Sequence, residues 1–365
     1  MKNIFTLTFS LLSLLSIAQN GAPAAPYYNG FNFNTSGATL KSALATKITA
    51  THTNQLTYQE AEFAIKVVDI DPDGNGIDLL LLYGFSSNQC PEASSDDKDH
   101  RTRHVTFEDD GSAASCLWNR EHTFPRALGI PNLGQTGPGA DAHHLRACDK
   151  KRNADRDNDK FYDDFGDSHE SGALWYPGDE WKGDVARMVM YMYLRYGNQC
   201  LPTNVGVGTI VPSDPNMIDV FLKWNAEDPV SQYEDNRNTY LGNRSNSWAQ
   251  GNRNPFIDNP YLATVIWGGI PAENRWPTIL STPEANLNNV IAVYPNPSID
   301  HRINISTTLE IDEIQLINVN GQIVQVIKNP IHNSNNYILE NIPNGFYFLK
   351  MNSNNQSITK KVIIH

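Results

Sequence analysis

The sequence changes character near residue 290, and this change predicts two parts that fold around separate cores. Residues 293–365 contain neither Cys nor Trp, and their five basic side chains balance their five acidic ones. The formal charge of −12 over 365 residues therefore belongs to the preceding part. A chain of this length is long enough for two domains. We expect a linker at about residues 270–292, where Pro271, Pro277 and Pro283 occur.

The C-terminal part contains short apolar runs separated by turn residues. Asn320-Gly321, between two such runs, is a signal for a type I′ hairpin turn. About 70 residues of this kind predict a small antiparallel β-sandwich. We expect its strands at Ile314–Val319, Gln322–Ile327, Tyr337–Leu339, Phe346–Met351 and Ser357–Ile364.

This tail resembles the C-terminal sorting domain of the type IX secretion route of Gram-negative bacteria. The resemblance rests on Val293–Pro297, Gly345–Lys350 and Thr359–Ile364. It implies that residues 293–365 are a sorting signal, which the type IX secretion machinery recognises at the outer membrane and which is afterwards removed. The alternative is a carbohydrate-binding or adhesion sandwich, and the tail has few of the aromatic signals that a sugar platform would need.

The first 18 residues have the features of a signal peptide. Lys2 precedes a short apolar stretch, and Ser16 and Ala18 place small residues before a cleavage site at Gln19. No later run reaches about 18 apolar residues, so we expect no membrane insertion. The sequence thus predicts a secreted protein, exported through the periplasm, whose larger domain spans residues 19–284.

The four cysteines, Cys90, Cys116, Cys148 and Cys200, favour two disulfides in an exported chain. The sequence leaves three connectivities open, with a weak preference for Cys90–Cys116 together with Cys148–Cys200. None of them forms a Cys-x-x-Cys pair, which argues against a cysteine-based zinc site.

The larger domain is rich in helix and loop, which places the protein in the α+β class. Its clearest helix candidate is Lys182–Tyr196, ended by Gly197. Apolar residues surround this whole segment, which is typical of a buried core helix. Short strands are expected at Asp78–Tyr83 and His104–Phe107.

The segment Asp69–Gly76 has the spacing of acidic residues seen in calcium-binding loops. In an EF-hand, however, position twelve of the loop is a bidentate carboxylate, and here that position falls on Leu80. We interpret the segment as a turn rich in Asp and Asn, with an isolated Ca²⁺ site as the alternative.

Two polar segments about thirty residues apart contain the side chains suited to chemistry, Trp118–Pro125 and Asp141–Asn158. Cleaving a phosphodiester needs a base for water, a hard cation on the phosphate oxygens and donors for the developing charge. His122 can serve as the base near neutral pH. Glu121 and Asn153 supply oxygen ligands suited to Mg²⁺.

Several further side chains near this set are expected to assist. Arg152, Arg156 and Arg120 are predicted to contact phosphate or substrate. His143 and Asp141 are predicted to support the site from behind, without touching the reacting atoms.

The two segments resemble the ββα-metal, or His-Me finger, core of the bacterial endonuclease I family, whose members are periplasmic or secreted nucleases of low sequence specificity. The family's metal-binding Glu and general-base His match Glu121-His122. Its second motif matches Asp141–Leu145 and Asn153–Asn158, with twelve positions from the Asp to the metal-binding Asn. The similarity covers roughly residues 55–270.

Two departures from the family pattern stand out. His144 occupies a position where the family often has Asn, and the stretch Leu241–Gln250 is an insertion that could reshape the substrate groove. Neither departure replaces the expected base or a metal ligand.

The leading hypothesis is therefore a secreted, Mg²⁺-dependent endonuclease that cleaves DNA, with RNA as a further substrate, without sequence specificity. Ca²⁺ or Mn²⁺ are alternatives to Mg²⁺. Because the net charge is negative, nucleic acid would have to bind through a local basic patch or the metal. The sequence does not indicate the oligomeric state.

Two other functions compete with this hypothesis. A surface Ca²⁺-binding adhesion protein would leave Glu121, His122 and Asn153 without a role. A zinc hydrolase built on His122, His143 and His144 is disfavoured because the adjacent His143 and His144 should point to different sides of their element.

Overall fold

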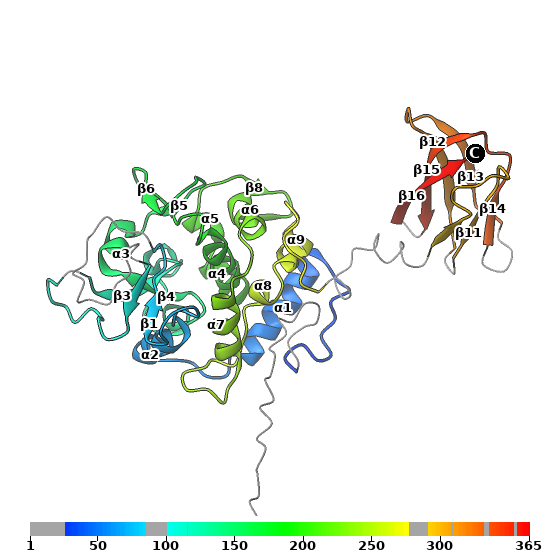
Figure 1. Cartoon of the computed structure of the whole chain (residues 1–365). Coiled ribbons are helices and arrows are strands. Elements are labelled where there is room, and N and C mark those ends of the chain that lie inside the picture. The colour runs from blue at the N-terminus through cyan, green and yellow to red at the C-terminus, as the bar shows by residue number, and fades with distance from the viewer. Residues whose placement is uncertain are drawn as a thin grey trace, which may run out of the picture. The chain divides into compact units, whose positions relative to one another are not determined.

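The computed structural model describes residues 26–84, 101–114, 116–276, 291–307, 310–331, 336–353 and 356–365, and the predicted signal peptide lies outside them. The chain divides into two compact units, Met1–Trp276 and Pro277–His365 (Figure 1). No helix in the described ranges is long and apolar enough to cross a membrane.

The first unit combines helices with short strands. Its α-helices are α1 (Gly37–Thr51), α2 (Tyr58–Val68), α3 (Lys150–Arg156), α4 (Lys182–Tyr196), α5 (Pro202–Val205), α6 (Asp219–Glu227), α7 (Gln232–Gly242), α8 (Pro255–Asp258) and α9 (Tyr261–Trp267). Its strands are β1 (Asp78–Leu80), β2 (Thr102–His104), β3 (Trp118–His122), β4 (Leu145–Asp149), β5 (Lys160–Phe161), β6 (His169–Glu170), β7 (Leu174–Tyr176), β8 (Ile210–Val211) and β9 (Asp214–Ile218). The 3₁₀ turns are η2 (Arg126–Leu128), η3 (Gly137–Ala140) and η4 (Gly197–Gln199).

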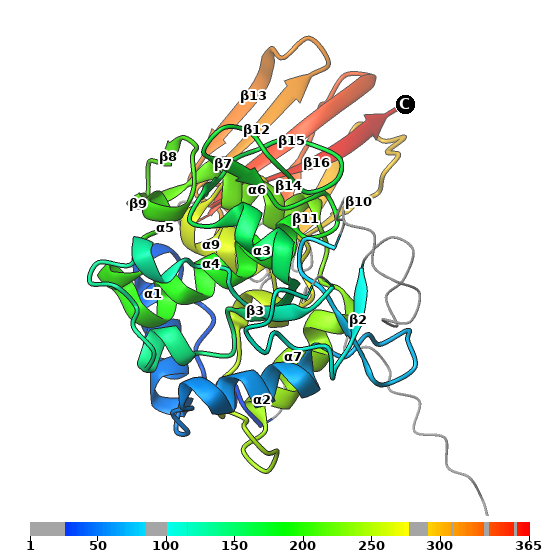
Figure 2. The ribbon, with the colours of Figure 1, turned by 90° about the vertical axis from the view of Figure 1, so that its left-hand side faces the viewer.

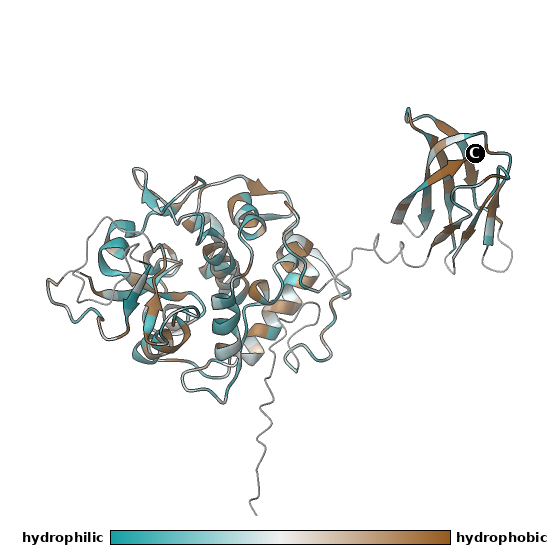
Figure 3. Cartoon of the chain, in the orientation of Figure 1, coloured by the Kyte–Doolittle hydropathy of each residue, from teal (hydrophilic) through white to brown (hydrophobic). Residues whose placement is uncertain are grey.

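The predicted core helix is confirmed as α4, with the expected bounds. Every side chain from Gly183 to Leu194 is buried, so α4 is enclosed on all sides by the rest of this unit. The helix ends at Gly197, whose φ of +56° lies in the left-handed region that glycine adopts easily. Figure 3 colours the ribbon of each unit by the hydropathy of its residues.

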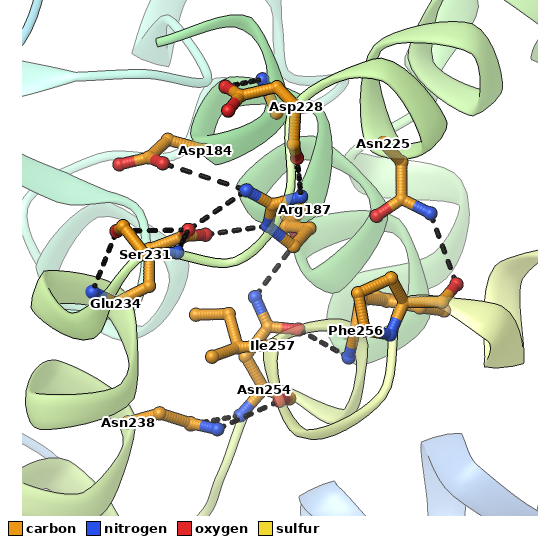
Figure 4. A network of polar contacts seen from close by, with 12 residues as sticks. Asp184, Arg187, Asn225, Asp228, Ser231, Glu234, Asn238, Asn254, Phe256 and Ile257 are labelled. Atoms are coloured by element: carbon orange, nitrogen blue, oxygen red, sulfur yellow. Dashed lines mark hydrogen bonds and ion pairs between the residues drawn. The ribbon is translucent and has the colours of Figure 1, made fainter. Parts of the chain in front are cut away.

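A buried polar network ties α4 to α7 and to the loop after α6 (Figure 4). Arg187 donates from Nε and Nη2 to the two carboxylate oxygens of Glu234, at 2.6 and 2.9 Å. Its Nη1 donates to the backbone oxygen of Asp228 at 2.8 Å. The backbone N–H of Gly183 donates to the Asp228 carboxylate, and a Cβ at Gly183 would lie 2.5 Å from the Asp228 backbone oxygen. Only a glycine at position 183 therefore allows the backbone of Asp228 to come this close.

The strand predictions for the first unit were only partly right. β1 covers the first half of Asp78–Tyr83, and it pairs antiparallel with β2, which ends at His104, where we expected a strand to begin. The strand stops there because a turn follows: the N–H of Phe107 donates to the backbone oxygen of His104 at 2.9 Å. The ring nitrogen Nδ1 of His104 also accepts from the N–H of Thr106.

The acidic segment near residue 70 forms the expected turn. The side chain of Asp71 accepts from the N–H of Asp73 at 3.1 Å, and that of Asn75 accepts from the N–H of Ile77 at 3.0 Å. Asp69 does not belong to this turn: it is buried, where it accepts from the N–H of Ala147 at 2.6 Å and pairs with Arg237.

The predicted pairing of Cys148 with Cys200 is wrong, because both are buried free thiols. They belong to different elements: Cys148 lies in β4, where its Sγ donates to the backbone oxygen of Leu82 at 3.3 Å, and Cys200 follows η4. Cys116 is disulfide-bonded. Cys90 lies outside the described residues.

The second unit is the predicted antiparallel β-sandwich. Its strands are β10 (Ala292–Tyr294), β11 (Ile303–Ser306), β12 (Glu313–Asn318), β13 (Ile323–Lys328), β14 (Asn336–Leu339), β15 (Gly345–Ser353) and β16 (Gln356–Ile364). One sheet has the order β10-β11-β14 and the other the order β13-β12-β15-β16, and neighbouring strands run antiparallel. Ile305, Leu316 and Leu349 are among the buried residues of the core between the sheets.

The turn between β12 and β13 differs from the predicted type. A type I′ turn has positive φ at both central residues, whereas Gly321 has a φ of +80° and Asn320 is not in the left-handed region. The loop is longer than the predicted two residues, since β12 ends at Asn318 and β13 begins at Ile323. The side chain of Asn318 accepts from the N–H groups of both Asn320 and Gln322, at 3.0 Å each. These hydrogen bonds from the Asn318 side chain hold the loop that joins β12 to β13.

Candidate active site

The two polar segments form a β-hairpin followed by a helix. β3 and β4 pair antiparallel, with Glu121 opposite Arg146 and His122 opposite Leu145. α3 begins directly after β4, and the Asp149 carboxylate caps it by accepting from the N–H groups of Lys151 and Arg152. The hairpin lies between α3 on one face and α2 on the other (Figure 2).

Glu121 projects toward the α3 face of β3 and is buried. Its Oε1 accepts from the hydroxyl of Tyr83 at 2.9 Å and lies 3.4 Å from Nη1 of Arg156. Burial raises the pKa of this carboxyl, and the nearby Arg156 and Tyr83 oppose that effect. Tyr83 and Arg156 both approach Oε1, and the backbone N–H of His122 is a further hydrogen-bond partner of this carboxylate.

Asn153 on α3 is held on the same face. Its Nδ2 donates to Oδ1 of Asn119 at 2.7 Å and to the backbone oxygen of Arg120 at 3.3 Å. Asn119 and Glu121 are two residues apart on a strand, so their side chains lie on one face. The amide group of Asn153 is therefore anchored through its nitrogen beside Glu121, and no described residue donates a hydrogen bond to its Oδ1.

His122 projects to the opposite face, toward α2. Its Nε2 lies 3.0 Å from the backbone oxygen of Gly139. A carbonyl can only accept, so Nε2 carries the proton and Nδ1 carries the free lone pair. The ring stacks on Tyr58 with centroids 5.9 Å apart. Burial, together with the neighbouring His144, holds the pKa of His122 well below its usual value, so the ring is neutral at neutral pH.

The structure places the three predicted arginines differently from one another. Arg156 is 1% exposed, and besides Glu121 it donates to the backbone oxygens of Thr123 and Asp157 at 3.1 Å each. Arg152 donates to Oγ of Ser168 at 2.6 Å. Arg120 lies 3.5 Å above the Tyr58 ring and donates to the Glu62 carboxylate at 2.8 Å.

Asp141 and His143 lie between η3 and β4, away from these side chains. Asp141 is buried and accepts from the hydroxyls of Tyr191 and Tyr196, at 2.8 Å each. His143 is also buried, and its Nε2 donates to the backbone oxygen of Asn252 at 3.0 Å. These hydrogen bonds connect the hairpin to α4 and to the loop after α7, and none of them reaches Glu121, His122 or Asn153.

Four residues of the site were not found by sequence reasoning. Tyr83 and Tyr58 reach Glu121 and His122 from more than thirty residues away, and a single sequence carries no signal of such contacts. Arg126 lies 5.6 Å from the Tyr58 ring. Gly139 could have been noticed, since Gly137-Pro138-Gly139 is a strong turn signal between the two polar segments.

Comparison with known families assigns most of the first unit to one family. Residues 36–261, more than half of the chain, match the Endonuclease I family. The chain belongs to the endonuclease I family. An extracellular ribonuclease of Bacillus subtilis (strain 168) is 36% identical over 271 residues, which cover 70% of this chain and 84% of the relative. An extracellular ribonuclease of Bacillus amyloliquefaciens is 37% identical over 243 residues, covering 64% and 75% respectively.

The second unit has its own match. Residues 292–365 match the family of secretion system C-terminal sorting domains. Both resemblances drawn from the sequence are thus confirmed, together with the α+β fold class. The protein is a secreted member of the endonuclease I family, a group of nucleic-acid hydrolases, and its tail implies passage through the type IX secretion machinery.

Proposed function

We propose that this endonuclease I family member is a Mg²⁺-dependent endonuclease that hydrolyses both DNA and RNA without sequence specificity. The observation that carries the proposal is the arrangement along β3: Glu121 and Asn153 share one face, and His122, with a free Nδ1, follows Glu121 directly. RNA is included because the two relatives are named as ribonucleases.

The donor set at Glu121 and Asn153 fits a hard divalent cation. One carboxylate oxygen and one carboxamide oxygen are the ligand types that Mg²⁺ binds, and two protein ligands leave positions for water and phosphate. Asn153 is oriented for this role because its nitrogen is fixed on Asn119. A bound ion would stabilise negative charge on the phosphate oxygens. Ca²⁺ and Mn²⁺ suit the same donors.

His122 is assigned the general base. Nδ1 would accept a proton from the attacking water, and the hydrogen bond from Nε2 to Gly139 holds the tautomer that keeps Nδ1 free. Arg156, which is buried against Glu121, is assigned to orient that carboxylate instead of binding phosphate. The partly exposed Arg120 and Arg152 keep the role of substrate contacts.

Because water is the nucleophile in this scheme, the 2′-hydroxyl of RNA has no chemical role. We therefore expect DNA, RNA and RNA methylated at every 2′-oxygen to be cut at similar rates with Mg²⁺, and none of them with EDTA. The measurement is the initial rate on matched oligonucleotides of one sequence. Methylated RNA that resists while plain RNA is cut would contradict water attack and identify the 2′-oxygen as the nucleophile.

The acidic net charge leads to a prediction on salt dependence. If nucleic acid binds through a few local cations and the metal, the slope of log affinity against log salt should correspond to about three to six phosphates. Binding can be measured in Ca²⁺ with the His122→Ala variant, so that the substrate stays intact. A slope near zero would exclude binding through the phosphates.

The sorting tail should be dispensable for catalysis. A chain of residues 19–284 contains all the described residues of the first unit, and it should fold and cut nucleic acid at the rate of the full-length protein, because the two units have separate cores. Rates should be compared after circular dichroism has shown that both proteins are folded. A folded but slower short chain would show that the tail helps to bind substrate.

A further inference from the structure

His144, the residue that departs from the family pattern, lies directly beside the assigned base. The rings of His122 and His144 are 5.5 Å apart, with an angle of 63° between their planes. Building on the proposed function, we propose that His144 is a positioning residue that holds the His122 imidazole in its catalytic orientation and tautomer.

The two imidazoles are held by neighbouring carbonyls of the same turn. Nε2 of His144 lies 2.7 Å from the backbone oxygen of Pro138, and Nε2 of His122 lies 3.0 Å from that of Gly139, both within η3. Both rings therefore carry their proton on Nε2. The bond from His144 fixes the peptide group immediately before the carbonyl that orients His122.

The turn itself has little freedom to move. A Cβ on Gly139 would lie 2.1 Å from the backbone oxygen of Gly134, so η3 is in close contact with the preceding loop. The N–H of Gly139 also donates to the backbone oxygen of Thr136 at 3.2 Å. With the turn held from one side by this loop and from the other by His144, the Gly139 carbonyl presents a fixed acceptor to His122.

His144 has a feature that packing alone does not explain. The side chain is fully buried, and its Nδ1 has no hydrogen-bond partner among the described residues. Burying an unpaired acceptor is unfavourable, so an apolar ring would fill this space at lower cost. An apolar ring, however, has no N–H group to donate to the backbone oxygen of Pro138. We therefore assign the presence of histidine at this position to that hydrogen bond.

The charge state of His144 agrees with this role. Burial lowers its pKa to about 4, so the ring is neutral at neutral pH. A neutral neighbour does not oppose the positive charge that His122 acquires when it accepts a proton. The supporting groups around His122 are thus Tyr58, His144 and the η3 turn, which contact the ring and leave Nδ1 free.

Two variants of the full-length protein separate the donor from the ring. His144→Phe keeps a buried aromatic ring but removes the N–H, and it should lower kcat by about 10- to 100-fold with KM unchanged. His144→Gln keeps a donor that can reach Pro138, and it should recover most of that loss. His104→Phe is the control, because the His104 ring contacts Thr106 and Phe107 and none of the site residues, and its kcat should match the wild type.

A spectroscopic readout tests positioning independently of the rate. In protein with ¹⁵N-labelled histidine side chains, His122 should show the Nε2–H tautomer in the wild type and in His144→Gln, and a mixture of tautomers in His144→Phe. A wild-type kcat and an unmixed tautomer in His144→Phe would overturn the proposal. If that variant does not fold, a mixed tautomer in His144→Gln would overturn it instead. Activity retained by His122→Ala would reject His122 as the general base, and failure of the wild-type protein to cut DNA or RNA with Mg²⁺ would reject the proposed function itself; both outcomes are separate from those above.

Discussion

Replacing His122 with alanine is expected to lower the rate of phosphodiester hydrolysis by roughly 10²–10⁴-fold, the usual contribution of a general base. The loss arises because no other described side chain offers a free imidazole nitrogen next to Glu121 on β3. Affinity for metal and for nucleic acid should be nearly unchanged, since the oxygen ligands remain. Single-turnover rates with saturating enzyme measure this loss directly.

Glu121→Ala and Asn153→Ala should behave differently from His122→Ala. Each removes a proposed oxygen ligand, so the apparent affinity for Mg²⁺ should fall, and raised Mg²⁺ should partly restore the rate. Asn158→Ala is the matched control, because Asn158 follows α3 closely, is exposed and bonds only to Asp157 among the described residues. Restoration of His122→Ala by excess Mg²⁺, without restoration of Glu121→Ala, would show that the two roles are reversed.

Replacing Arg187 with methionine is expected to destabilise the first unit by about 3–5 kcal/mol, the cost of leaving a buried charge without its partner. Burial disfavours an ionised Glu234, and the paired Arg187 overcomes this and keeps the pKa of Glu234 below its usual value. Without Arg187, Glu234 would be a buried carboxylate beside Asp184, whose own pKa is raised by burial and by Glu234. Urea denaturation measures the change.

A half-exposed ion pair supplies the comparison. Lys223 pairs with Asp163 at 2.5 Å, and both side chains are about 40% exposed. Lys223→Met should therefore cost no more than about 1 kcal/mol. The double variant Arg187→Met with Glu234→Leu should regain much of the lost stability, because it removes the unpaired charge. Equal losses for Arg187→Met and Lys223→Met would show that the buried network contributes little.

Short-range patterns in the sequence predicted the fold well. α4 has the expected bounds because its apolar residues, its length and the terminating glycine all favour the same helix. Five of the seven strands of the sorting domain, β12 to β16, were predicted to within one or two residues, since short apolar runs between turn residues specify them, whereas β10 and β11 were not predicted. Adjacent residues on a strand face opposite sides, so the separation of Glu121 from His122 also follows from the sequence.

One wrong prediction and one revised assignment involve contacts between residues distant in the chain. The pairing of Cys148 with Cys200 was chosen from spacing, and it fails because the two thiols sit in different elements. Arg156 was assigned to phosphate because it lies near Asn153 in the chain. On a helix, however, residues three apart share a face, and this brings Arg156 to the same side of β3 as Glu121, where it is buried.

The direct junction between β4 and α3 limits how this enzyme can diverge. The strand ends at Asp149 and the helix begins at Lys150, so no connecting loop separates the two. Each residue advances an α-helix by about 100°, and a single inserted residue at this junction would therefore present a different side chain at the position of Asn153. Elsewhere the first unit has long loops in which length can vary at small cost. At this junction the rotation of α3 relative to β4 decides which side chain stands at the position of Asn153, the proposed metal ligand, and we expect selection to eliminate insertions or deletions there.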